Sequence, residues 1–324
     1  MIKVESMPEL SKTFKRYSGW SGADGIYTFN HDNKVLWYFS DTIVGDSGKE
    51  TDKRIKYSFI NNSFGISSKH IDDIEFIYPE DVSSCIVPKK EGYYWLQDGI
   101  VIGDNLYIFG LHMKNELLEE LPFAIEGVDV IKYDLTNISK FKYEIIETKD
   151  FCFDDYIFGA STLDNREVDG YIYIYGYKNI PGNKQVVLSR VKYGLNNQIE
   201  YLYNDDSWST QKKELKILAE HFAAEFKVIK LKDKYFCVYT LDSMGKDIYL
   251  VKSNNIEEKF SNIQKIYECP EHLYKPNWMT YNAKIQKALS SEKELIVSYS
   301  VNSLVNSEHE DLNIYYPRFF KIYL

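Results

Sequence analysis

One repeated pattern constrains the fold of this chain more than any other feature of its sequence. The pattern is a small or polar entry, an alternating strand, a short turn rich in Gly, Asp, Asn or Lys, and a second strand rich in aromatic residues. Its copies begin at Gly22, Leu96, Phe158, Ala223 and Tyr281. Each copy and the chain that follows it are long enough for four strands with their loops, which is typical of a radial array of small sheets.

The composition of the chain also favours strands. Aromatic residues make up 16% of its 324 residues, and Tyr and Phe fit the half-buried, pleated surface of a sheet. Helical periodicity is nearly absent, and four-stranded antiparallel sheets that close radially expose only short edges. We therefore predict an all-β fold, a five-bladed β-propeller in which residues 1–324 form a single domain. The C-terminal segment FFKIYL is expected to pair with N-terminal residues.

A β-sandwich, or two small β domains, is the alternative fold. Neither of these explains why similar units recur at such intervals.

The charge of the chain excludes two classes of partner. Its 39 Lys and Arg residues stand against 48 Asp and Glu residues, so the net charge is −9 at pH 7. An acidic chain has no general attraction for nucleic acid or for anionic lipid. No segment approaches the roughly 20 apolar residues of a membrane helix, and the first residues lack the apolar core of a secretory signal. We expect a cytoplasmic protein, or a secreted one if a signal peptide has been removed, and leave its oligomeric state open.

Aligning the five copies places three acidic residues at one position of the repeat. The first strand of each propeller blade lines the central channel, so equivalent positions converge at one mouth. Crowding and desolvation push the pKa values of such carboxyls apart. Glycoside cleavage needs this division, because one carboxyl protonates the leaving oxygen while the other activates water or attacks carbon. The aligned residues are Asp24, Asp98, Ala160, Glu225 and Asn282.

The neighbours of two of these acids suggest different roles. Glu225 lies among apolar residues, so desolvation should raise its pKa and keep it protonated as the general acid. Asp24 lies between glycines, whose free backbone amides should stabilise a charged carboxylate and make Asp24 the base. The alternative for any one of these acids is a turn or cap residue that bonds backbone amides.

Other side chains near the predicted mouth are candidates for substrate binding. Asp41 closes the second strand of the first blade, where it could bond a sugar hydroxyl, support Asp24 or simply form an Asx turn. Trp20 and Tyr281 lie next to the aligned positions and are the preferred stacking residues, with Trp95, Trp208 and Trp278 as further candidates. The predicted binding set is Trp20, Asp41, Asn61, Asn62, Gln97, Tyr281 and Asn282.

The sequence predicts no cofactor. His112 and His221 flank inner strands without the spacing of a zinc site. The four cysteines form no CxxC pair, which indicates buried free thiols, and a zinc site or a disulfide frame is the alternative for them. No phosphate-binding or dinucleotide-binding fingerprint is present. A calcium ion in the channel is left open.

Three N-terminal runs resemble a known group. GWSGADG at residues 19–25, LWYFSDT at 36–42 and Asn61-Asn62-Ser63, together with Gln97-Asp98-Gly99, are similar to the bacterial "domain of unknown function 4185" proteins. That group includes endo-acting D-arabinofuranosidases. The blade layout resembles glycoside hydrolase families 43, 32 and 68.

The resemblance implies a glycoside hydrolase acting on furanosides or related oligosaccharides. Carried over residue by residue, it implies Asp24 as base or nucleophile, Asp98 as pKa modulator or second catalytic carboxylate, and Glu225 as acid. The chain departs from family 43 at Gly25, where Pro is usual, and at Phe226, where Gly-Pro commonly follows the acid. We expect inversion of the anomeric centre. 

Two other functions are alternatives. One is a non-catalytic carbohydrate-binding propeller, and the other is a glycoside phosphorylase or a propeller enzyme of small-molecule biosynthesis. Only five of the 39 basic residues are arginine, which argues against a phosphate site.

Overall fold

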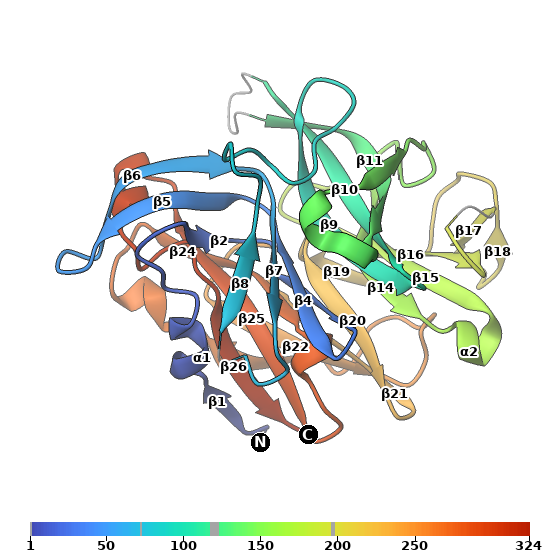
Figure 1. The fold of residues 1–324 in the computed structure, drawn as a ribbon. Coiled ribbons are helices and arrows are strands. Elements are labelled where there is room, and N and C mark those ends of the chain that lie inside the picture. The colour runs from blue at the N-terminus through green and yellow to red at the C-terminus, as the bar shows by residue number, and fades with distance from the viewer. Residues whose placement is uncertain (1, 72, 117–122, 196–197) are drawn as a thin grey trace.

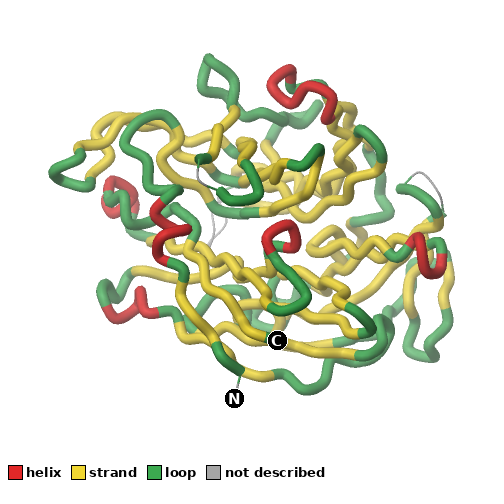
Figure 2. Tube along the Cα trace, turned by 60° about the horizontal axis from the view of Figure 1, so that its bottom comes forward, coloured by secondary structure: helices red, strands yellow, loops and turns green. Residues whose placement is uncertain are grey.

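The computed structural model describes residues 2–71, 73–116, 123–195 and 198–324. In these ranges antiparallel strands dominate and the helices are short (Figures 1 and 2). The strands assemble into five blades, and in each the four main strands follow the chain from the inside outward, except that β1 forms the outer strand of the last blade. The fold is an all-β, five-bladed β-propeller, as the repeats predicted.

The blades have closely similar layouts. The first contains β3 (Tyr27–His31), β4 (Lys34–Phe39), β7 (Ser63–Ser67) and β8 (Ile74–Ile77). The second contains β9 (Tyr93–Ile102), β10 (Asn105–Asn115), β11 (Phe123–Asp134) and β12 (Tyr143–Ile146). The third contains β14 (Tyr156–Asp164), β15 (Tyr171–Lys178), β16 (Lys184–Lys192) and β17 (Ile199–Leu202), with β13 (Cys152–Phe153), β18 (Trp208–Ser209) and β19 (Ala219–Phe222) attached. The fourth contains β20 (Phe226–Leu231), β21 (Lys234–Thr240), β22 (Asp247–Ser253) and β23 (Gln264–Glu268). The fifth contains β24 (Trp278–Ile285), β25 (Glu294–Ser303), β26 (Arg318–Tyr323) and β1 (Val4–Ser6).

The two ends of the chain complete the fifth blade together. β1 pairs with β26, with Val4 opposite Ile322, and the termini lie side by side in Figures 1 and 2. The predicted pairing of the C-terminal strand with N-terminal residues is therefore confirmed. On the inner side, Gln286 joins the last blade to the first. Its Nε2 donates to the carbonyl oxygen of Ile26 at 3.0 Å, and its Oε1 accepts from Thr28 Oγ1 at 3.0 Å.

A small additional sheet prolongs the first blade. It contains β2 (Trp20–Ala23), β5 (Thr42–Gly48) and β6 (Lys53–Ile60), which project away from the ring in Figure 1. Only residues 24–26 separate β2 from β3, and only residues 40–41 separate β4 from β5. The first blade is thus bent at Asp24 and Asp41.

The helical segments occupy connections between strands. They are α1 (Pro8–Lys12), α2 (Arg166–Asp169) and the 3₁₀ segments Leu135–Lys140 (η1), Pro270–Leu273 (η2), Lys287–Leu289 (η3) and Asn306–Glu310 (η4). Among the described residues, no helix is long and apolar enough to cross a membrane.

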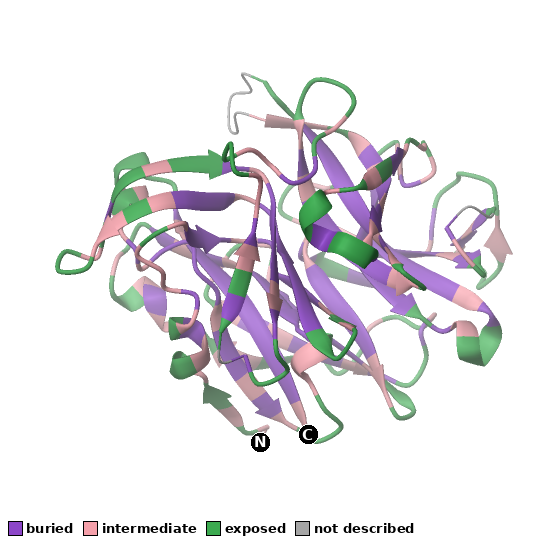
Figure 3. Ribbon diagram, viewed as in Figure 1, coloured by how far each residue is buried: buried purple, intermediate pink, exposed green. Residues whose placement is uncertain are grey.

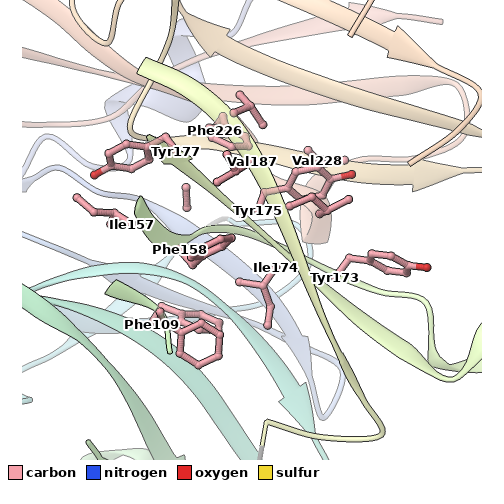
Figure 4. Close-up of a cluster of buried hydrophobic side chains, with 14 of the residues drawn as sticks. Phe109, Ile157, Phe158, Tyr173, Ile174, Tyr175, Tyr177, Val187, Phe226 and Val228 are labelled. Carbon is pink, nitrogen blue, oxygen red and sulfur yellow. The ribbon is translucent and has the colours of Figure 1, made fainter. Parts of the chain in front are cut away.

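Aromatic side chains fill the spaces between blades. Buried positions concentrate on the strands, and exposed ones on the turns and short helices (Figure 3). Figure 4 shows one such cluster, in which Phe158, Tyr175 and Phe226 come from inner strands of adjacent blades or from the strand beside them. The ring centroids of Tyr175 and Phe226 are 6.3 Å apart in an edge-to-face arrangement, which aromatic pairs favour. The high Tyr and Phe content thus supplies the interblade core.

Candidate active site

The five aligned positions of the repeat all lie at an interruption or at the start of an inner strand. Asp24 separates β2 from β3, and Glu225 immediately precedes β20. Asp98, Ala160 and Asn282 lie at register shifts in β9, β14 and β24. A bulge re-aims side chains out of the regular alternation of a strand. The repeat therefore marks the point at which each blade can turn a side chain along the channel.

Asp24 and Asp41 form the centre of an acidic cluster, which we define as Asp24, Asp41 and Glu225. The backbone N–H of Asp24 donates to the carbonyl oxygen of Asp41 at 3.1 Å, and the carbonyl oxygen of Asp24 accepts from Ser40 N at 2.9 Å. The bend of the first blade thus holds the two acids as neighbours. All three members of the cluster are partly exposed.

Three polar side chains bind the acidic pair. The hydroxyl of Tyr281 donates to Asp24 Oδ2 at 2.6 Å. Oδ1 of Asp41 accepts from Trp95 Nε1 at 3.1 Å and from Asn61 Nδ2 at 3.3 Å. Residues of the first, second and fifth blades therefore meet at this pair. Tyr281, Asn61 and Trp95 are themselves partly exposed.

The environment of this pair favours retention of a proton. Burial and the charge of Asp41 raise the pKa of Asp24 to about 8, although the hydrogen bond from Tyr281 opposes the rise. Burial also raises the pKa of Asp41 to about 6, against the hydrogen bonds from Asn61 and Trp95. The prediction that glycine neighbours keep Asp24 readily ionised was wrong. Its carboxylate bonds a tyrosine hydroxyl, and a second carboxylate repels its charge.

Glu225 meets the expectation drawn from its apolar neighbours. Burial raises its pKa, while the cations of Lys284 and Lys184 act in the opposite direction. Its charge also contributes to the raised pKa of Asp24. The two acids therefore interact electrostatically across the ring.

Lys284 is a part of this site that the sequence analysis missed. Only 1% of the residue is exposed, and its Nζ has no hydrogen-bond partner among the residues that the structure describes. Nζ lies 3.7 Å from the ring centroid of Tyr27. Burial lowers the pKa of Lys284 to about 7, and the charges of Glu225, Asp98 and Asp24 oppose that fall. Lysine is almost never fully buried without a partner, and here several carboxylates surround it.

Asp98 is placed differently from the other two acids. It is fully buried, and its Oδ2 accepts from the Thr162 backbone N–H at 2.6 Å and forms an ion pair with Lys227. These contacts join the second, third and fourth blades. Without accessible surface, Asp98 cannot touch a substrate in this arrangement, which argues against a second catalytic carboxylate. Its charge instead acts on Lys284, whose pKa it helps to raise. Lys227 was also missed by the sequence analysis.

Four residues of the predicted binding set are buried and unavailable to a substrate. Trp20 is 2% exposed, and its ring stacks on Phe76 with centroids 4.0 Å apart. Asn62 is fully buried and bonds the backbone of Ile86 through both its amide nitrogen and its amide oxygen. Gln97 and Asn282 are 5% and 4% exposed. These assignments are corrected, because the four side chains pack inside the protein.

The remaining predicted binding residues do gather at the acidic cluster. Asp41, Asn61 and Tyr281 belong to it or bond it directly. Trp95 extends from the same place, and its ring packs edge-on against Phe123 with centroids 4.7 Å apart. Trp208 instead bonds Glu257 near the outer edge of the third blade.

Metal-binding groups are sparse in the described part of the chain. No group of three or more His, Cys, Asp or Glu side chains there is arranged to hold a metal ion. His112 bonds the carbonyl oxygen of Glu91 through Nε2 at 2.9 Å. The four cysteines are free, and three of them are buried.

Comparison with known proteins gives one family and several structures of the same fold. The model of the family "Domain of unknown function (DUF5005)" matches residues 8–323. No curated protein matches the chain. This family is not the group that the N-terminal motifs resemble.

Three solved structures are similar over nearly the whole chain. A protein of Bacteroides ovatus ATCC 8483, provisionally described as a hydrolase, has 20% identity and a TM-score of 0.82, covering 99% of this chain and 90% of its own. A GH62 hydrolase in complex with xylotriose has 10% identity and a TM-score of 0.51, with coverages of 96% and 99%. An α-L-arabinofuranosidase of Podospora anserina in complex with cellotriose has 9% identity and a TM-score of 0.51, with coverages of 94% and 92%. These identities are low, so the similarity establishes a shared fold.

Proposed function

The chain belongs to the family described as domain of unknown function 5005, and we propose that it is a glycoside hydrolase whose catalytic carboxyls are Asp24 and Glu225. One observation carries the proposal. Two partly exposed carboxyls from different blades interact with each other, and the pKa of each is raised. Perturbed acids that converge in this way are typical of acid–base catalysis. The names of the structural neighbours, a GH62 hydrolase and an arabinofuranosidase, support the same reaction class.

In the proposed mechanism Asp24 is the general base. The pKa of Asp24 is about 8, so its ionised carboxylate binds a proton far more tightly than that of an ordinary aspartate. The ionised form of such a group is therefore a strong base toward an attacking water, and its share grows as the pH rises through about 8. Asp41 supplies the charge that raises this pKa, and Tyr281 holds the carboxylate in place.

Glu225 is the proposed proton donor. Burial keeps its proton on at a higher pH than in water, so the residue can protonate the leaving oxygen of a sugar. Lys284, which interacts with both acids, limits the rise of both pKa values. In this mechanism Asp98 and Lys227 are positioning residues, which support the reacting groups and do not touch the substrate.

The proposed substrate is a neutral oligosaccharide that contains furanoside linkages, such as arabinan. The resemblance of the N-terminal motifs to endo-acting arabinofuranosidases supports a furanoside. The presence of xylotriose and cellotriose in two structural neighbours supports an oligosaccharide. Trp95 and Asn61, which bond Asp41 and remain partly exposed, are the proposed contacts to the sugar. We propose inversion, with water activated by Asp24.

The test is hydrolysis of a panel of arabinan, arabinogalactan, xylan and fructan by the purified protein and by its Asp24→Asn variant. We expect reducing ends to form with one member of the panel and to be lost in the variant. NMR of the first product should show the inverted anomer. Binding of a panel member without turnover would instead favour a carbohydrate-binding propeller and overturn the proposal.

A further inference from the structure

A pocket that does not include the acidic cluster lies beside the fifth blade. It has a volume of about 520 Å³ and is lined by residues of β1, α1, β23, η2, β24, β25 and β26 and of the loops that lead into β24 and β26. None of Asp24, Asp41 and Glu225 lines it. Its size is sufficient for one or two sugar rings, since small-molecule pockets begin at about 300 Å³.

A buried ion pair forms one wall of this pocket. Glu271 is 6% exposed, and its two carboxylate oxygens each accept from the Tyr299 hydroxyl at 3.1 Å. Oε1 of Glu271 also accepts from Arg318 Nε at 3.3 Å. The guanidinium of Arg318 lies 3.6 Å from the ring centroid of Tyr316. These contacts hold the polar groups of the wall in fixed positions.

The other charges at the pocket are also paired. Lys275 Nζ donates to Asp311 Oδ2 at 2.7 Å, and Lys12 Nζ donates to Glu9 Oε1 at 2.7 Å. A charged ligand would find no uncompensated opposite charge among these groups. An apolar ligand would cover ion pairs without replacing their contact with water, which is unfavourable.

Aromatic rings complete the lining. Tyr267, Tyr274 and Trp278 join Tyr299 and Tyr316 around the pocket. Flat rings beside fixed donors and acceptors suit a ligand that has apolar faces and many hydroxyl groups. A neutral saccharide has that combination, with C–H groups on its faces and hydroxyls around its edge.

One short segment separates the pocket from the acidic cluster. Tyr316 lines the pocket, while the pKa of the adjacent Tyr315 is raised by burial and by the charges of Asp24 and Asp41. Tyr315 has a φ of 61°, a left-handed conformation that is uncommon for a bulky residue. Of these two consecutive tyrosines, one therefore interacts electrostatically with the acidic cluster and the other lines the pocket.

From this arrangement we propose that the pocket is a second, non-catalytic binding site for a neutral saccharide. The proposal goes beyond the hydrolase function, because the pocket shares no residue with the acidic cluster and involves no bond cleavage. Its ligand is recognised by stacking on the tyrosines and by hydrogen bonds to the paired charges.

The indole N–H groups of two tryptophans allow each site to be observed separately. Trp95 bonds Asp41 in the acidic cluster, and Trp278 lines the pocket. In an NMR titration of the Asp24→Asn variant, the probes are xylotriose, cellotriose and α-1,5-arabinotriose. Loss of one signal in Trp278→Phe and of another in Trp95→Phe assigns the two resonances. We expect at least one probe to shift the Trp278 resonance to saturation.

A matched pair of exposed residues tests whether the shift comes from the pocket. Tyr274 lines it and is 73% exposed, whereas its neighbour Leu273 is 76% exposed and does not line it. Tyr274→Ala should weaken the affinity read at Trp278 by roughly five- to tenfold, the usual effect of removing an aromatic contact. Leu273→Ala should leave it unchanged. Circular dichroism spectra of both variants should match that of the parent protein.

Two results would overturn the second site. They are a Trp278 resonance that stays in place with all three probes, or equal effects of Tyr274→Ala and Leu273→Ala on the affinity read at Trp278. Failure of the hydrolase proposal is distinguishable. It would appear as absent turnover in the wild-type protein while the Trp278 resonance still shifts.

Discussion

The hydroxyl of Tyr281, in the last inner strand, donates a 2.6 Å hydrogen bond to Oδ2 of Asp24, in the first blade. The bond favours the ionised form of Asp24 and opposes the effects of burial and of Asp41 on its pKa. It also spans the junction at which the ring closes. One contact thus connects closure of the propeller with the protonation state of the proposed base.

Tyr281→Phe should therefore reduce activity at neutral pH and shift the acidic limb of the pH profile upward. Hydrogen bonds to charged groups contribute about 1.5–3 kcal/mol, so kcat/KM should fall by roughly tenfold or more. The phenylalanine keeps the ring, so packing is largely preserved. A pH profile of kcat/KM on the best panel substrate measures the effect. Loss of activity without a change in the profile would show that the hydroxyl does not tune Asp24.

Asp41→Asn should shift the same limb in the opposite direction. The base must lose its proton to act, so wild-type kcat/KM should rise as the pH increases through about 8, the raised pKa of Asp24. The variant removes the charge that helps to raise this pKa. Its acidic limb should therefore move to lower pH, with greater relative activity below neutrality.

The matched control for this prediction is Asp46→Asn, since Asp46 lies in β5, the strand that follows Asp41, but has no part in the cluster. If instead a falling limb near pH 8 moves in Asp41→Asn, Asp24 is the proton donor and the assigned roles are reversed. An unchanged profile would separate Asp41 from the catalytic base altogether.

Replacement of Lys284 by Met should displace the whole profile to higher pH. The cation of Lys284 lowers the pKa of both Asp24 and Glu225. Without it the base needs a higher pH to ionise, and the acid keeps its proton to a higher pH. Lys287→Met is the control, because Lys287 is exposed three residues further along the chain. A change confined to kcat, with both limbs in place, would contradict an electrostatic role.

Asp98→Asn should destabilise the protein more than it alters the chemistry. The change leaves Lys227 as a buried charge without its anion, and breaking a buried pair in this way costs roughly 3–5 kcal/mol. The double variant Asp98→Asn with Lys227→Met removes both charges and should recover much of that stability. Urea unfolding of the three proteins measures these differences. If the double variant is stable but inactive, Asp98 acts on the reaction, as the family resemblance implies.

The blades could be predicted from the sequence because strand alternation and turn residues are local signals. Their recurrence also placed Asp24 and Glu225 at equivalent positions, and both lie just before an inner strand, β3 or β20. Trp20 was misplaced because the bend after β2 turns it toward Phe76, a long-range contact. The alternation of side chains along a strand cannot reveal such a bend.

The two buried lysines could not be predicted for a related reason. Lys284 follows the register shift of β24, and a shift of one residue moves a side chain to the other face of a strand. A lysine in an alternating strand is otherwise read as exposed. Only their spacing in the sequence could have indicated these lysines as site residues. Lys227 lies two residues after the aligned Glu225, and Lys284 lies two residues after the aligned Asn282.

Glu225→Gln tests the proposed acid most directly, through the leaving group of the substrate. A natural sugar needs a proton to depart, whereas an acidic phenol leaves without one. The variant should therefore lose about 10²- to 10⁴-fold in rate on the oligosaccharide while keeping much of its activity on an activated aryl glycoside. Asp24→Asn should lose activity on both substrates, because water activation is needed in either case. Glutamine preserves the size of the side chain, so thermal unfolding should confirm that both variants remain folded. Equal losses on the two substrates in Glu225→Gln would remove Glu225 from the role of acid.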